Sequence, residues 1–435
     1  MPIKAAFMVP HPPLIIPQVG NGNEKQVEAT IHSYEQVADE IAALRPETIV
    51  ISSPHIVMYG DYFHIPSGKG GEGSFSRFGA PEVSFNEEYD TELLDAIVTF
   101  AEKEGIPAGP EGMRDPQLDH GTMVPLYFIR QRYQGGKIVR IGLSGLSLSE
   151  HYRLGQAVGR AVENLGRSVV WVASGDLSHK LQDYGPYGYA PEGPEYDRRL
   201  MEVCGRGALK ELLDFDEELC EKAAECGHRS FVMMAGALDG RQLKARSYSH
   251  EDVTGVGYGI CSFYPQPSPH VALARKALET YIREGRVMPI PEGLPAELTE
   301  KRAGAFVSIH EKGALRGCIG TILPVRECLA AELIDNAISA STRDPRFDPI
   351  TEDELPLLDI SVDVLEEPED IASPAELDVK RYGVIVTKGF RRGLLLPDLD
   401  GVDTVEEQIA IAKRKAGIAP GEEVSLQRFE VIRHL

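Results

Sequence analysis

Short apolar runs recur along the first part of the chain, and each run ends in polar residues or in Gly and Pro. They do not alternate strictly between apolar and polar positions, which predicts strands covered on both faces. Between them, residues 27–44 and 154–165 repeat apolar side chains with a helical period. Strands that alternate with helices are typical of an α/β sheet. The predicted strands are residues 3–10, 48–55, 137–145, 168–176 and 256–264.

The segment SGKGGEGSFSRFGAPE, residues 67–82, is rich in glycine and breaks this pattern. We expect a mobile loop there. It lacks the GxxxxGK motif, so it does not predict a phosphate-binding loop.

A proline-rich stretch at residues 264–270 interrupts both helix and strand and predicts a domain boundary, with domains at 1–266 and 267–435. A new pattern follows it, beginning with a helix that ends at Gly285. The segments GAFVSIH and GALRGCIGTI then predict a hairpin. This second region reads as a smaller α+β domain. Its remaining predicted elements are a helix at 326–340, a strand at 358–366, a hairpin at 383–397 and a helix at 404–416.

Composition narrows the class of protein. The chain has 435 residues, of which 42% are hydrophobic and 26% charged, as in ordinary globular proteins. Its net charge of -22 argues against a nucleic acid or an anionic membrane as partner. Six scattered cysteines without a CxxC pair indicate a reducing compartment. Prolines break the apolar N-terminal stretch, so we expect no signal peptide, no membrane span and a cytoplasmic location.

Three histidines follow predicted strands. His11 lies between two prolines after the first strand, His55 ends the second, and His179 follows the fourth. In an open α/β sheet, ligands bind outside the carboxyl ends of the strands. Parallel strands would therefore bring these three side chains to one edge, and imidazole is a common metal ligand. The pattern predicts a shared metal site.

The motifs VPHPP, SSPH, LDHGTMVPL and SGDLSH, in this order, resemble the class III extradiol ring-cleavage dioxygenases (LigB-like) and the related Memo family. The resemblance covers roughly residues 1–265. It implies a non-haem Fe(II), or another divalent metal, held by His11, His55 and a carboxylate. Two histidines and one carboxylate leave coordination positions open for a catecholate and O₂.

The same resemblance implies two further site residues. His179 resembles the catalytic histidine that moves a proton between substrate and oxygen, which suits an imidazole. His120 resembles a second pocket histidine; alternatively, it is a helix N-terminal residue bonded to its own turn. Asp176 could orient the ring of His179, but we favour a helix N-cap role for it.

The third metal ligand departs from the family pattern within AAECGHRSFVMMAGAL, residues 223–238. Ring-cleaving enzymes use a glutamate here, which indicates Glu225, whereas Memo-like relatives use a cysteine, which indicates Cys226. Neighbours on a helix point about 100° apart, so only one of the two is expected to reach the metal. We favour Glu225 by a small margin.

The motifs GALRGCIGT and DPRFDPI resemble the AMMECR-type domain, which accompanies Memo-like proteins and a radical-SAM enzyme in the AmmeMemoRadiSam system. The resemblance covers about residues 268–435 and implies a fold but no reaction. On a strand, Arg316 and Cys318 would share one face, where a guanidinium could activate the thiol. A structural role for Cys318 is favoured, since cysteine is often buried.

These observations predict an α/β LigB-like domain, a central sheet flanked by helices, followed by a smaller α+β AMMECR-type domain. The leading function is that of an iron-dependent oxidoreductase that opens the ring of a small catechol-like aromatic substrate with dioxygen. The alternative is a Memo-like metal-binding component that serves a radical-SAM protein partner without ring cleavage.

Overall fold

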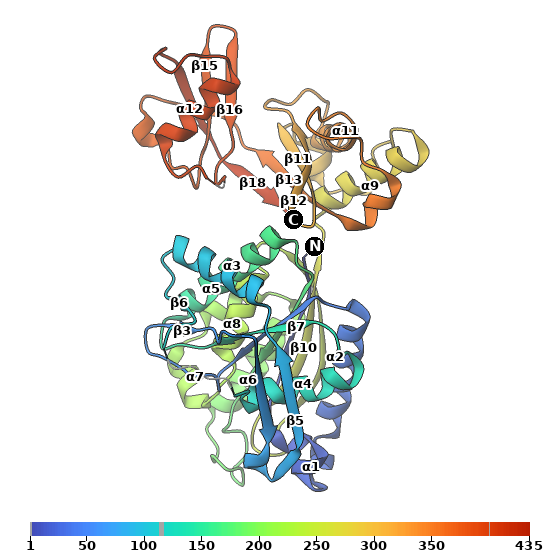
Figure 1. Ribbon diagram of the computed structural model, residues 1–435, viewed down its shortest axis with the longest axis vertical. Helices are drawn as coiled ribbons and strands as arrows, with labels where there is room; N and C mark the ends of the chain where they lie inside the picture. The colour runs from blue at the N-terminus through green and yellow to red at the C-terminus, as the bar shows by residue number, and fades with distance from the viewer. Residues whose placement is uncertain (1, 113–116, 400) are drawn as a thin grey trace. The chain divides into compact units, whose positions relative to one another are not determined.

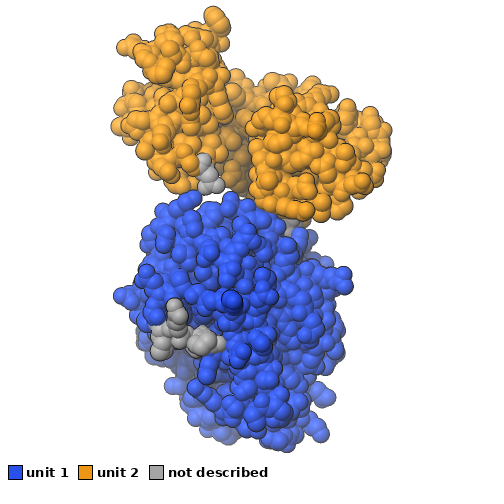
Figure 2. Space-filling view, viewed as in Figure 1, with its two compact units in different colours: residues 1–266 blue, residues 267–435 orange. Residues whose placement is uncertain are grey.

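The computed structural model describes residues 2–112, 117–399 and 401–435. These residues form two compact units, Met1–Gln266 and Pro267–Leu435 (Figure 2). The junction between the units lies inside the proline-rich stretch at 264–270.

The first unit is built on a six-stranded sheet with the strand order β7-β2-β8-β1-β10-β9 (Figure 1). The four strands β7, β2, β8 and β1 run parallel, and β10 and β9 add an antiparallel edge. All five predicted strands are present, which confirms the α/β class. The strand bounds are β1 Ile3–Val9, β2 Thr48–Ser53, β7 Lys137–Gly142, β8 Val169–Ser174, β9 Gln242–Glu251 and β10 Tyr258–Gln266.

Except at the edge strand β9, both faces of this sheet are buried, which explains why its other five strands are apolar without strict alternation. In β1, Met8 packs into the core beneath α5 and α8, while Phe7 packs into the opposite core beneath α2 and α4 (Figure 1). None of the described helices is both long and apolar enough to cross a membrane. The helix bounds are α1 Pro17–Gly20, α2 Glu28–Leu44, α3 Thr91–Lys103, α4 His120–Arg132, α5 Leu148–Leu165, α6 Glu192–Arg206, α7 Glu217–Ala223 and α8 His228–Ala237.

The glycine-rich segment at 67–82 is not the predicted loop. It forms strand β4 (Gly70–Phe75), a short 3-10 turn and the start of β5 (Ala80–Glu88), paired as an antiparallel hairpin. Its glycines permit close approach: a Cβ on Gly70 would lie 2.1 Å from the carbonyl oxygen of Glu87. Strand β9 was also missed, because this polar edge strand has no apolar run. Two short strands, β3 (Phe63–His64) and β6 (Ala108–Gly109), pair separately.

The second unit contains two four-stranded sheets, ordered β12-β11-β13-β18 and β14-β17-β15-β16. Helix α9 ends at Gly285, whose φ of 67° suits a glycine C-cap, as predicted. The predicted α+β class is confirmed. The element bounds are α9 Pro269–Glu284, α10 Ala296–Glu300, β11 Ala305–Glu311, β12 Ala314–Gly320, α11 Leu329–Thr342, β13 Leu358–Leu365, β14 Glu369–Ile371, β15 Gly383–Lys388, β16 Arg391–Leu395, α12 Val405–Lys415, β17 Ser425–Phe429 and β18 Val431–His434.

Candidate metal centre

The carboxyl ends of three adjacent parallel strands bring the candidate ligands of the first unit together. Strand β8 lies between β2 and β1, so the residues after β1 and β2 meet above the end of β8. His11 follows β1 and His55 follows β2. Their Nε2 atoms lie 3.0 Å apart, and their rings meet edge to face. The side chains of two residues 44 positions apart in the sequence thus converge on the same point.

A serine at the end of β8 sets the tautomer of His11. The hydroxyl of Ser174 donates its single proton to the carbonyl oxygen of Gly121 at 2.6 Å. Its Oγ, 3.0 Å from Nδ1 of His11, must therefore accept a hydrogen bond from Nδ1–H. The lone pair of His11 is left on Nε2, the atom that faces His55. Burial and the nearby charge of His55 also lower the pKa of His11 well below its usual value, so the ring is neutral.

Cys226 brings a sulfur atom to the same spot. Its Sγ lies 3.6 Å from Nε2 of His11 and accepts a hydrogen bond from the backbone N–H of Asp176 at 3.3 Å. The approach depends on two glycines, since a Cβ on Gly175 would lie 2.1 Å from Cα of Gly227. Burial raises the pKa of Cys226 well above its usual value, so the metal-free thiol is protonated at neutral pH.

Glu225, the residue favoured from the sequence, is not with the two histidines. Its carboxylate accepts a hydrogen bond from the backbone N–H of His228 at 2.5 Å, and burial raises its pKa to about 7. It lines a separate small cavity with Cys220 and Arg229. Residues 225–227 form a bend between α7 and α8, and this bend turns the two neighbouring side chains apart. Of the two candidate third ligands, the thiol of Cys226 is thus the one that lies with the two histidines.

Asp176 and His179 lie beside Cys226, and donor atoms of these three residues all lie within 4.8 Å of one another. No helix starts at Asp176, so the favoured N-cap role is wrong. Its Oδ1 instead accepts the backbone N–H of His11 at 2.8 Å, and burial raises its pKa to about 6. Nε2 of His179 is buried without a hydrogen-bond partner in the described chain, and its ring stacks on Tyr187.

His120 begins helix α4, and its ring centroid lies 3.9 Å from that of His55. His120 is therefore both the first residue of helix α4 and a neighbour of the candidate ligand His55. Burial, with the charges of His55 and His11, lowers the pKa of His120 to about 3. The ring is neutral and is available as an acceptor or a ligand.

Asp119 organises this part of the site and was missed in the sequence, although it directly precedes His120. It caps α4 and accepts hydrogen bonds from Ser53 and from the fully buried Arg140, whose Nη2 lies 2.8 Å away. Burial alone would raise the pKa of Asp119, but Arg140 and the hydrogen bonds outweigh it and lower the pKa to about 2. Oγ of Ser53 in turn accepts the backbone N–H of His55.

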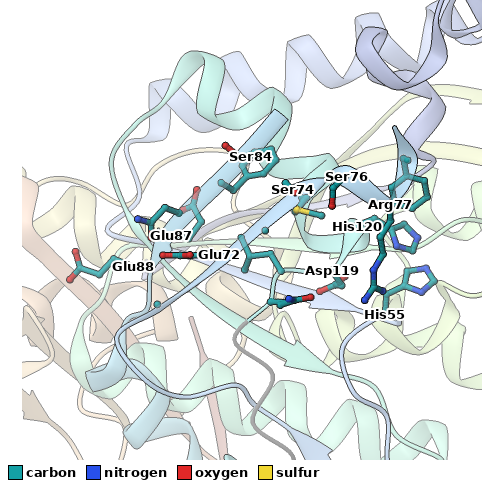
Figure 3. Close-up of a pocket in the computed structure, with 18 of the residues that line it drawn as sticks. His55, Glu72, Ser74, Ser76, Arg77, Ser84, Glu87, Glu88, Asp119 and His120 are labelled. Atoms are coloured by element: carbon teal, nitrogen blue, oxygen red, sulfur yellow. The ribbon is translucent and has the colours of Figure 1, made fainter. Parts of the chain in front are cut away.

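A cavity of about 1660 Å³ opens beside His55 and His120. The hairpin of β4 and β5 forms much of its wall, so the misassigned glycine-rich segment belongs to the site. Figure 3 draws Arg77 beside both histidines. The volume exceeds the ~300–1,000 Å³ of most ligand pockets, so a small aromatic molecule would fit.

The motif LRGCIGT of the second unit is held by ion pairs and hydrogen bonds. Arg316 pairs with Glu354 at 2.7 Å, so its guanidinium is neutralised there and is not directed at Cys318. The thiol of Cys318 accepts a hydrogen bond from Ser308, and its backbone N–H binds Asp344 of the DPRFDPI motif. A second guanidinium, that of Arg346, donates to the carbonyl oxygen of Cys318 at 3.1 Å, and Cys318 is only partly buried, so its structural role stays a prediction.

The fold and the donor atoms define an α/β protein with a candidate metal centre at the ends of its parallel strands. The family model described as the catalytic LigB subunit of aromatic ring-opening dioxygenase matches residues 5–261, and the AMMECR1 model matches residues 271–434. The chain therefore belongs to the LigB family and carries an AMMECR1 domain after its LigB domain, as the motifs predicted.

Known proteins are similar to all of this chain or to a part of it. Protein CA_C1420 of Clostridium acetobutylicum is 41% identical over 466 residues, which cover 100% of this chain and 99% of the relative. A protein of Thermotoga maritima is 54% identical over 168 residues, which cover 38% of this chain and 97% of the relative. The crystal structure of PH0010 from Pyrococcus horikoshii, at 33% identity, covers 39% of this chain and 91% of its own, with a TM-score of 0.36.

Proposed function

We propose that the LigB domain is a metal-dependent, Memo-like component that holds Fe(II) through His11, His55 and Cys226. The observation that carries the proposal is the convergence of two imidazole nitrogens and one sulfur, all within 4.8 Å of one another. The ring of His11 is buried and His55 is exposed, but both have lowered pKa values, so they are neutral and suited to bind a metal. A thiolate makes the donor set softer than two histidines and a carboxylate.

The residues around the donors have separate roles in this proposal. Fe(II) bound here would supply Lewis acidity, redox chemistry and open coordination positions. His179, with an unpartnered Nε2 next to Asp176, is placed to hold or move a proton. The backbone N–H of His11 holds Asp176 by its Oδ1, which orients the carboxylate toward the donors.

Ring-opening dioxygenase activity is the second candidate. The cavity beside His55 and His120 favours it, because an aromatic substrate would lie next to the metal ligands. The description of the matching family also supports it. The turned-away Glu225 counts against it, because the glutamate of the ring-cleaving pattern is then not among the donors.

One experiment separates the two candidates. The full-length protein is loaded with Fe(II) without oxygen, its metal content is measured, and it is then mixed with a panel of catechols and air. The Memo-like proposal predicts bound Fe(II) that is lost in the His11→Ala variant, and no yellow ring-fission product. Ring fission that is lost in His179→Ala while the iron is retained would establish the dioxygenase instead.

A partner and a location belong to the same proposal. All six cysteines are free thiols, which supports a reducing compartment such as the cytoplasm. The LigB and AMMECR1 domains together support service to a radical-SAM protein. Size-exclusion chromatography of this protein with a radical-SAM protein from the same genome tests this: separate elution at micromolar concentrations would contradict it.

A further inference from the structure

A second group of metal-ligating side chains lies in the other unit, among residues that no motif singled out. His270 is the second residue of α9, Glu297 lies on α10, and His434 is the last residue of β18. The two rings stack with their centroids 3.6 Å apart and an interplanar angle of 19°. Oε1 of Glu297 lies 3.8 Å from Nε2 of His270, and one ligand atom from each residue lies within 4.8 Å of the others.

Three of the four imidazole nitrogens of this cluster are buried without partners in the described chain. Within the described chain, neither ring nitrogen of His270 accepts or donates a hydrogen bond, and Nε2 of His434 is also unpartnered. The side chain of His270 is only 4% exposed. Buried polar atoms in proteins are nearly always paired, so three unpaired nitrogens in contact indicate a missing ligand.

Charge and burial favour a cation over another hydrogen-bond donor. The unpaired ring nitrogens of His270 and His434 can each offer a lone pair to a metal ion. Glu297 adds a carboxylate oxygen. Lys301 is the nearby positive charge that lowers the pKa of both histidines, and its ammonium group is paired with Glu366 at 2.7 Å.

We infer that His270, Glu297 and His434 form a binding site for a divalent transition metal such as Zn²⁺. Two imidazoles and one carboxylate are ligands typical of zinc, and three protein ligands leave one position for water. The site joins the first helix of the second unit to its last strand, whose chain end is already tied by the hydrogen bond from Ser268 N–H to the carbonyl of Leu435. The inference is independent of the metal proposed for the first unit.

The test uses the full chain with the first site removed by His11→Ala, His55→Ala and Cys226→Ala. This triple variant is titrated with Co²⁺, whose visible absorption reports nitrogen and oxygen ligation, and Zn²⁺ is then added to displace it. We expect about one equivalent to bind, and Glu297→Gln to weaken binding at least about 10-fold. Glu297 is 44% exposed, so this substitution leaves the core intact.

Two further variants make the result decisive. His270→Gln in the same background should abolish binding, whereas His310→Gln, in the same unit but outside the cluster, should leave it unchanged. Circular dichroism verifies that each variant is folded. Equal Co²⁺ affinity with and without Glu297→Gln, or no binding in the triple variant, would overturn the inference.

Discussion

The two candidate metal clusters differ in the hydrogen bonds that hold their candidate ligands in place. In the first unit, Ser174 holds His11, the backbone of Asp176 holds Cys226, and Ser53 holds the backbone of His55. In the second unit, the described chain offers no hydrogen bond to either ring nitrogen of His270. Hydrogen-bonded partners fix ring orientation and tautomer before the metal arrives.

This difference predicts two kinds of site. A ligand set that is already oriented loses little conformational entropy on binding and should bind tightly. The stacked pair in the second unit must reorient around its ion, so we expect weaker and more exchangeable binding there. The following predictions test this contrast.

Removing a ligand of the first cluster should have the largest effect. His11→Ala and Cys226→Ala should each lose stoichiometric Fe(II), because each removes one of three donor atoms. Glu225→Gln, the matched control, should keep it, since its carboxylate binds the backbone of His228. Metal analysis after anaerobic loading and desalting is the measurement. Loss of iron in Glu225→Gln with retention in Cys226→Ala would reverse the ligand assignment.

Breaking the support beneath the first cluster should be the next largest effect. Asp119→Asn leaves Arg140, which is fully buried, without its charge partner. Removing one member of a buried ion pair costs about 3–5 kcal/mol, so the free energy of unfolding should fall by that amount. Urea unfolding measures it.

The control is Asp39→Asn, which breaks an exposed pair of the same length, 2.8 Å, with Arg132. Exposed pairs contribute up to about 1 kcal/mol. The pH dependence of stability follows from the lowered pKa of Asp119. Its carboxylate contributes fully to the free energy of unfolding above pH 4, and this contribution is lost as the pH falls toward about 2. Equal losses in the two variants would contradict the supporting role of Asp119.

Removing the hydroxyl behind His11 should have a moderate effect. Ser174→Ala leaves the ligand in place but frees its tautomer and ring, so metal affinity should fall about 10–100-fold. Ser230→Ala removes another buried hydroxyl, which binds Ser52 and does not contact His11, and should leave affinity unchanged. Competition with a chromogenic chelator measures both. An unchanged metal affinity in Ser174→Ala would contradict the idea that hydrogen bonds to the ligands make the first cluster bind more tightly than the second.

The smallest expected difference is in proton release at pH 7. The raised pKa of Cys226 keeps its thiol protonated before binding, so a metal in the first cluster should displace about one proton. The second cluster has no thiol and its histidines are already neutral, so it should displace about none. Calorimetry in buffers of different ionisation enthalpy counts the protons. Equal release from the two sites would contradict these protonation states.

Five strands of the central sheet in the first unit were predictable because apolar runs are local signals, and so are histidines at strand ends. Strand ends have a known direction in a parallel sheet, so His11 and His55 could be placed together without coordinates. The choice between Glu225 and Cys226 could not be made in this way, because it depends on a bend after α7, where Ala224 adopts a left-handed φ of 55°. A helix was assumed there.

Other features had no local signal at all. Asp119 acts through Arg140, which comes from the distant strand β7, and the sequence offers nothing that links them. The cluster of the second unit joins residues 164 positions apart, with no repeated spacing or motif around either histidine. The pairing of β18 with β13 brings residues 431–434 to the sheet, and this pairing has no signal in the local sequence.

The close contact between Gly175 and Gly227 fixes the position of the segment that carries Cys226. A methyl group on Gly175 would lie 2.1 Å from Cα of Gly227, more than ~1 Å short of ordinary van der Waals contact, so the two segments would have to separate. Metal–ligand bonds accept deviations of only about 0.2 Å. Cys226 precedes Gly227 directly, so the displacement would reach its sulfur. The substitution Gly175→Ala, at a residue that is not a metal ligand, would therefore weaken metal binding as much as the loss of a ligand.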